Sequence, residues 1–233
     1  MIMVGSASEP YPREEEETLL MRRSLEVIDR LEFGVSLRTK SLRLLRDLDV
    51  LQSIHRKTRC VVEVMLTTAD EELAARLEPA ESGTAERLKL LAALRDAGIP
   101  TVVTLGPVLP YLTDSLANLE ALLADCVETG VYGVLQNGFG VTLRAGSSAY
   151  FFSRLRELSP ELPERYEALL PPGKLRKAGT FLSPHAEVLA AFFQKSTDAC
   201  KLVTDAETLF AYRHAFEDRR AGKQLSLFDL FET

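Results

Sequence analysis

Three short apolar stretches near the start of the chain are each followed at once by polar side chains that could bind a ligand or transfer a proton. These side chains are Ser6, Glu9 and Tyr11 after the first stretch, Thr39, Lys40 and Ser41 after the second, and Thr67, Thr68 and Asp70 after the third. If the stretches are parallel strands, their carboxyl ends lie along one edge of a sheet, and these side chains converge on one pocket. The alternative is that they only cap the helices that follow, which explains Ser41.

Lys40 has the clearest chemistry of this set. A lysine at a strand end, inside a small polar cluster, suits an anionic group such as a carboxylate. We therefore expect Lys40 to bind a ligand, with Glu9, Tyr11 and Thr67 lining the substrate pocket beside it. A different enzyme class stays open, in which Lys40 and Glu9 carry out acid-base or Schiff-base chemistry.

Several familiar sites are absent from the sequence. There is no G-x-G-x-x-G after a strand, no G-x-x-x-x-G-K-S/T loop and no G-x-S-x-G elbow. The three histidines have no second ligand at metal spacing. Cys60, Cys126 and Cys200 are widely separated, so we expect buried thiols and no metal site within this chain.

Strand and helix patterns alternate through the first 140 residues and must position these side chains. Strands are predicted at residues 1–4, 33–39, 60–68, 101–106 and 131–135, and helices at 14–31, 41–51, 86–97 and 114–127, the last capped by Asp114. Such alternation predicts an α/β fold with a parallel sheet, either an open doubly wound sheet or part of a barrel. From about residue 147 the strand signal fades, and helical segments punctuated by prolines follow.

Composition narrows the class of protein. The chain has 233 residues, of which 46% are hydrophobic and 27% are charged, and its net charge of -6 provides no broad basic surface for nucleic acid. The longest apolar run, at residues 99–112, contains three prolines and a glycine and is shorter than the ~20 residues of a membrane span. The N-terminus lacks the pattern of a signal peptide. We expect a cytoplasmic protein with no membrane contact.

The residues at the strand ends resemble a known family. GSASEPYPREEE is similar to the G-T-x-T-D-P-Y-Q-P-x-E signature of radical S-adenosylmethionine proteins related to spore photoproduct lyase. FGVSLRTKS with LRDLDVL, VEVMLTTADEELAARLEP, and AGIPTVVTLGPVLPYLTD resemble the same family in the same order. The similarity runs from Gly5 to about Asp114, and a weaker one continues through YFFSRL, ERY and SPHAEVL.

This resemblance implies a partial (β/α)6 TIM-like barrel that cleaves S-adenosylmethionine at a four-iron four-sulfur cluster, in nucleic-acid repair or modification. The family holds its cluster in a C-x-x-x-C-x-x-C loop after its first strand. That loop is absent here, and the first readable strand aligns with the family's second. The expectation is therefore a barrel that lacks its first βα unit at residues 1–146, a helical C-terminal extension at 147–220, and no activity for this chain alone.

The resemblance also assigns residues to the cofactor. Ser6 and Lys40 match positions that bind the methionyl part of S-adenosylmethionine, with Lys40 on its carboxylate. Arg87 and Pro107 match two further family positions near the cofactor. There are two departures. Met65 stands where the lyases have a serine that touches the cofactor, and Gly5 stands where they have the cysteine that donates a hydrogen atom, which disfavours spore photoproduct itself as the substrate.

The segment 221–233 carries a separate signal, KQLSLFDLF. Its core resembles the pentapeptide with which bacterial repair proteins bind the DNA sliding clamp, so Gln224, Leu225, Leu227 and Phe228 are predicted to contact such a partner. The alternative is an amphipathic helix that packs on its own domain. A third possibility for the whole chain is a non-catalytic module that docks on a partner through this tail.

Overall fold

The computed structural model describes residues 1–144, 146–170 and 179–215. The predicted clamp-binding residues Gln224, Leu225, Leu227 and Phe228 lie outside the described residues. Within the described part, no helix is long and apolar enough to cross a membrane.

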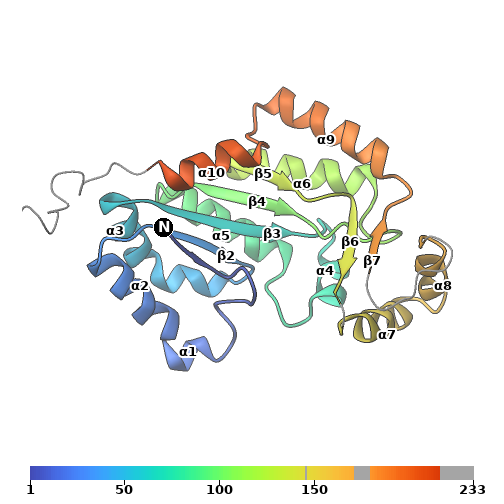
Figure 1. The fold of residues 1–233 in the computed structure, drawn as a ribbon, viewed down its shortest axis with the longest axis horizontal. Coiled ribbons are helices and arrows are strands. Elements are labelled where there is room, and N and C mark those ends of the chain that lie inside the picture. Colours follow the sequence, from blue (N-terminus) through green and yellow to red (C-terminus); the bar gives the residue numbers. More distant parts are fainter. Residues whose placement is uncertain (145, 171–178, 216–233) are drawn as a thin grey trace, which may run out of the picture.

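A five-stranded parallel sheet forms the centre of the protein (Figure 1). Its strands are β1 (Ile2–Val4), β2 (Val35–Thr39), β3 (Cys60–Leu66), β4 (Thr101–Leu105) and β5 (Gly133–Gln136). They lie side by side in chain order, from β1 at one edge to β5 at the other. A doubly wound sheet reverses its strand order at a switch point, and no such reversal occurs here. The predicted α/β fold with a parallel sheet is confirmed.

Helices cover one face of this sheet. They are α2 (Leu20–Arg30), the 3-10 helix η1 (Leu42–Asp47), α3 (Leu48–Lys57), α5 (Thr84–Asp96) and α6 (Leu116–Thr129). Alternate strand residues such as Leu37, Val62 and Val103 point to this face and pack with Leu25 and Leu90 from the helices. This layer is the main hydrophobic core, and it holds the carboxyl ends of the strands in a fixed arrangement.

The first predicted helix is in fact two helices, α1 (Glu15–Thr18) and α2. Leu19 between them has a left-handed backbone, with φ of 51°. The carboxylate of Glu15 accepts hydrogen bonds from the backbone N–H groups of Leu20 and Met21, at 3.0 and 2.9 Å, and so satisfies the start of α2. A carboxylate that caps the second helix therefore favours the break.

The predicted cap of the next long helix is also different. Ser115 caps α6, because its hydroxyl accepts a hydrogen bond from the backbone N–H of Asn118. The carboxylate of Asp114 instead accepts hydrogen bonds from Tyr111 N–H and the Ser183 hydroxyl. Asp114 thus joins two loops, a role that depends on residues far away in the sequence.

The second face of the sheet is covered at the amino ends of its strands by α10 (Ala206–His214) (Figure 1). Leu209 of α10 packs on Val61 and Val102. Farther along this face, Glu63 is 3% exposed and accepts a hydrogen bond from Thr104 at 2.6 Å. Its carboxylate also pairs with Arg38 at 2.8 Å and with Arg213 of α10 at 3.2 Å. This buried ion pair attaches α10 to the middle of the sheet.

The segment after β5 contains strands as well as helices. Its elements are β6 (Gly140–Leu143), α7 (Ser148–Leu158), α8 (Leu162–Glu167), β7 (Gly179–Leu182) and α9 (Ala186–Cys200). The remaining helix, α4 (Glu71–Leu77), lies earlier in the chain, between β3 and α5. β6 and β7 pair antiparallel and share an aromatic core with α7 and α8. α9 returns to pack on α6. No strand was predicted at β6, and only helices were predicted from residue 147 onward, where β7 lies, because a four-residue strand is too short to show a clear periodicity.

Candidate functional site

The turn after β1 brings the first polar loop onto the end of β2. Gly5 has a φ of +85°, and a Cβ at this position would lie 2.0 Å from the backbone oxygen of Arg38. Only glycine fits this close approach without a shift of the backbone. As a result Ser6, which is exposed, lies at the same edge of the sheet as the end of β2, where Lys40 follows.

Glu9 fixes the backbone at this strand end. Its carboxylate accepts hydrogen bonds from the Lys40 N–H at 2.8 Å, the Tyr11 N–H at 3.0 Å and the Thr39 hydroxyl. All three donors are uncharged. Glu9 thus joins the loop after β1 to the carboxyl end of β2 and sets the position from which the Lys40 side chain extends.

The side chain of Lys40 belongs to a cluster of three charged residues, Lys40, Glu78 and Arg87, hereafter the Lys40 cluster. The ammonium group donates to Oε1 of Glu78, and Nη2 of Arg87 donates to Oε2 of the same carboxylate at 2.7 Å. Arg87 also donates from Nη1 to the backbone oxygen of Met65 at 2.9 Å and from Nε to that of Ser82 at 2.8 Å. This arrangement holds Glu78 between two cations at the carboxyl end of β3.

Solvent exposure differs across the Lys40 cluster. The side chain of Lys40 is 22% exposed and that of Glu78 is 18% exposed, whereas that of Arg87 is only 3% exposed. Burial alone would raise the pKa of Glu78, but the charges of Lys40 and Arg87 and their hydrogen bonds outweigh it and lower that pKa. The cluster therefore presents one partly exposed cation, supported by a partly exposed carboxylate that pairs with a buried guanidinium group.

The other predicted site residues take different places. Tyr11 is fully buried, and its hydroxyl donates to Oδ2 of Asp47 at 3.0 Å. Thr67 is 7% exposed and donates to the backbone oxygen of Gly106 at 3.3 Å. Pro107 is exposed in the loop after β4. The structure thus brings Ser6, Glu9 and Lys40 to one edge, and it directs Tyr11 and Arg87 into the protein interior.

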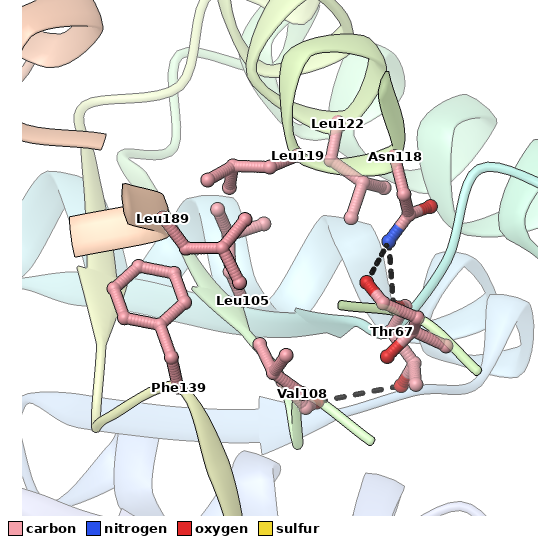
Figure 2. A pocket seen from close by; sticks show the side chains of 10 residues that line it. Thr67, Leu105, Val108, Asn118, Leu119, Leu122, Phe139 and Leu189 are labelled. Atoms are coloured by element: carbon pink, nitrogen blue, oxygen red, sulfur yellow. Dashed lines mark hydrogen bonds between the residues drawn. The ribbon is translucent and has the colours of Figure 1, made fainter. Parts of the chain in front are cut away.

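A small pocket lies between the carboxyl ends of β3 and β4 and helices α6 and α9 (Figure 2). Its apolar wall includes Leu105, Phe139 and Leu189, and its polar side chains are those of Thr67, Thr113 and Asn118. The amide of Asn118 donates to the backbone oxygen of Thr113 at 2.9 Å and that of Thr67 at 3.5 Å. Its oxygen accepts from Ala69 N–H and the Thr68 hydroxyl, at 2.8 and 3.0 Å.

Asn118 therefore connects the loops that follow β3 and β4, and both polar atoms of its amide are hydrogen-bonded to the protein itself.

Neither Asn118 nor Glu78 was predicted as a site residue from the sequence. Asn118 lies inside a predicted helix, where its type gives no functional signal. Glu78 precedes a proline in the stretch LEP, and only its contact with Lys40 distinguishes it from other exposed acids.

The cysteines lie on separate elements. Cys60 on β3 and Cys126 on α6 are buried, and Cys200 at the end of α9 is exposed. Burial raises the pKa of the Cys60 and Cys126 thiols to about 12. In the described ranges no group of three or more His, Cys, Asp or Glu residues is placed to hold a metal ion.

Comparison with solved structures relates the fold of this chain to that of spore photoproduct lyase. No family model matches the chain. The structure of spore photoproduct lyase complexed with a dinucleoside spore photoproduct superposes with a TM-score of 0.59 and 11% sequence identity, over 85% of this chain and 58% of that one. Two substituted variants of the same enzyme superpose with TM-scores of 0.52 and 0.54, over 79% of this chain. The chain thus has a fold like that of spore photoproduct lyase.

Sequence relatives match between 73% and 78% of the chain. The uncharacterized protein Rv2578c of Mycobacterium tuberculosis is 32% identical over 183 residues, which are 78% of this chain and 52% of that protein. An uncharacterized protein of Mycobacterium bovis matches to the same extent. The uncharacterized protein ORF301 of Acidianus two-tailed virus is 26% identical over 185 residues, 58% of its length. The chain spans about half the length of the curated relatives it matches.

Proposed function

We propose that this chain has the fold of a radical S-adenosylmethionine protein like spore photoproduct lyase, of a kind that serves in the repair or modification of nucleic acid, and that it binds S-adenosylmethionine at the carboxyl edge of its sheet. We further propose that β1 to β5 are a run of strands from a (β/α)6 barrel. The all-parallel strand order that follows the chain supports this, as does the match to spore photoproduct lyase. The observation that carries the proposal is Lys40, a partly exposed cation at the carboxyl edge of this fold.

The donors at this edge fit the amino-acid end of S-adenosylmethionine. An ammonium group suits its carboxylate, and the exposed Ser6 hydroxyl at the neighbouring strand end can donate or accept a hydrogen bond. When bound, S-adenosylmethionine would supply a reactive sulfonium centre. The part of this chain is to bind and orient the amino-acid end of that molecule, with Lys40 positioned by Glu9 and Glu78.

The described residues do not fit a four-iron four-sulfur cluster. Such a cluster needs thiolate ligands that converge, whereas two of the thiols are buried on different elements and the third lies on the surface. The contact of Lys40 with Glu78 disfavours the alternative function, in which Lys40 forms a Schiff base. A nucleophilic amine must be uncharged, whereas an ion pair suits a cation that binds an anion.

Isothermal titration calorimetry of the chain with S-adenosylmethionine tests the proposal. Lys40→Ala removes a charge-assisted contact worth roughly 1.5 to 3 kcal/mol, so the affinity should fall by about ten- to a hundredfold. Lys89→Ala is the matched control, because Lys89 is an exposed lysine on α5. No binding by the unmodified chain, or equal affinity in Lys40→Ala, would refute the proposal.

A further inference from the structure

Lys40 is held by the protein both at its backbone and at the end of its side chain. Its backbone N–H donates to the carboxylate of Glu9, and its ammonium group donates to the carboxylate of Glu78, which lies 38 residues later in the chain. A free lysine side chain has four rotatable bonds and loses rotamer entropy when a ligand orders it. A lysine that is already ordered in the free protein avoids most of this cost.

Glu78 is in turn held by the protein. Its second oxygen accepts from Arg87, and the guanidinium group of Arg87 uses its three nitrogens on Glu78, Met65 and Ser82. Arg87 is buried and balances the charge of Glu78. An ammonium group has three N–H bonds, and the contact with Glu78 uses one of them. The Lys40 cluster therefore keeps the net charge of one cation, with donors left for an incoming anion.

We propose that Glu78 is the positioning residue that orders the Lys40 ammonium for a ligand carboxylate, and that Arg87 holds Glu78 in place for this purpose. This inference rests on the proposed binding of S-adenosylmethionine. Glu78 could have the opposite role, because a carboxylate paired with Lys40 competes with the ligand carboxylate for the same ammonium group. The two roles predict opposite effects when Glu78 loses its charge.

The test compares two ligands in calorimetric titrations of the full chain. S-adenosylmethionine has the amino-acid carboxylate, whereas 5′-methylthioadenosine has the same adenosine but carries a neutral thioether in place of the sulfonium and lacks the amino-acid part. In Glu78→Gln we expect affinity for S-adenosylmethionine to fall roughly tenfold and affinity for 5′-methylthioadenosine to stay unchanged. Glu86→Gln is the matched control, because it removes the same charge from an exposed position one residue before Arg87. It should leave both affinities unchanged.

Each result decides between the roles. Tighter binding of S-adenosylmethionine by Glu78→Gln would show competition and overturn the inference, and equal loss for both ligands would show a merely structural role and overturn it too. If Glu78→Gln fails to fold, Glu78→Asp keeps the charge beside Arg87 but withdraws it from Lys40, and must show the same selective loss. If the unmodified chain binds no S-adenosylmethionine, the proposed function fails. If it binds and Glu78→Gln binds equally well, only this inference fails.

Discussion

Tyr11 was predicted to line the substrate pocket, but it lies in the protein interior. Its ring is fully buried, and its hydroxyl donates to Asp47. Burial and the negative charge of Asp47 both raise the pKa of Tyr11. The hydroxyl is therefore a proton donor held by a buried carboxylate, and it joins the loop after β1 to the start of α3.

Removal of this hydroxyl should reduce stability. Tyr11→Phe leaves a buried carboxylate oxygen of Asp47 without that donor, so we expect the free energy of unfolding to fall by about 1–3 kcal/mol. Urea denaturation measures this change. Tyr150→Phe is the control, since Tyr150 is 71% exposed, and its effect should be within about 0.5 kcal/mol. Equal effects of the two substitutions would refute the assigned contact.

Among the secondary-structure elements, α1 is attached to η1 and α2 is attached to α3 through carboxylates. Glu15 accepts from Arg46 at 2.8 Å, and Asp49 accepts from Arg22 at 2.9 Å. Burial by itself would raise the pKa of Glu15, but hydrogen bonds from Arg46, Met21 N–H and Thr18 outweigh it and lower that pKa. The hydrogen bond from Arg22 lowers the pKa of Asp49 to about 2. These elements are thus joined most firmly when both carboxylates are ionised.

Acid should therefore weaken this attachment. A carboxyl group whose pKa is lower in the folded state stabilises the protein above its unfolded pKa, and this stabilisation is lost as the pH falls through the folded value. For Glu15 the loss begins below its ordinary value of 4.5. We expect Glu15→Gln to lose less stability than the unmodified chain between about pH 6 and pH 3, measured by urea denaturation at each pH. The control is Glu14→Gln, because Glu14 is the exposed residue next to Glu15, and this variant should retain the pH dependence of the unmodified chain. The prediction would be contradicted if the stability of Glu15→Gln also depended on pH as that of the unmodified chain does.

Considered as a whole molecule, the protein exposes apolar side chains near one edge of its sheet. β1 is an edge strand, and its Met3 is 59% exposed. α2, which follows β1 in the chain, exposes Leu20 and Val27 by 60% and 43%, and Leu31, directly after α2, is 50% exposed. An unpaired strand edge with exposed apolar side chains favours pairing with another chain. This surface differs from the site edge, where charged and polar side chains gather.

We therefore expect the chain to self-associate as its concentration rises, as sedimentation velocity can measure. The double substitution Leu20→Glu with Leu31→Glu places two charges on this surface and should shift the protein toward monomer. Val188→Glu is the control, because Val188 on α9 is 56% exposed on a different helix. A chain that stays monomeric at high concentration would refute this prediction, as would equal effects of the two changes.

Much of the fold follows from local patterns in the sequence. Val62, Val64 and Leu66 lie on one face of β3 because side chains alternate along a strand, and Ser41 caps a helix because its hydroxyl reaches a backbone N–H two residues later. The placement of Lys40 at a strand end was equally local. Such features depend on a few neighbouring residues, so the sequence by itself determined the parallel sheet, its helices and the edge at which polar residues gather.

Contacts between distant residues were decided by the tertiary structure alone. The pairing of Lys40 with Glu78, the attachment of Arg213 to Glu63 across 150 residues, and the burial of Tyr11 against Asp47 each join segments whose separate patterns contain no sign of the partner. Periodicity reports whether a residue is buried, but not which polar group meets it there. The partner depends on how helices and loops pack over the sheet, and at this site that packing selects Glu78 as the residue that holds Lys40.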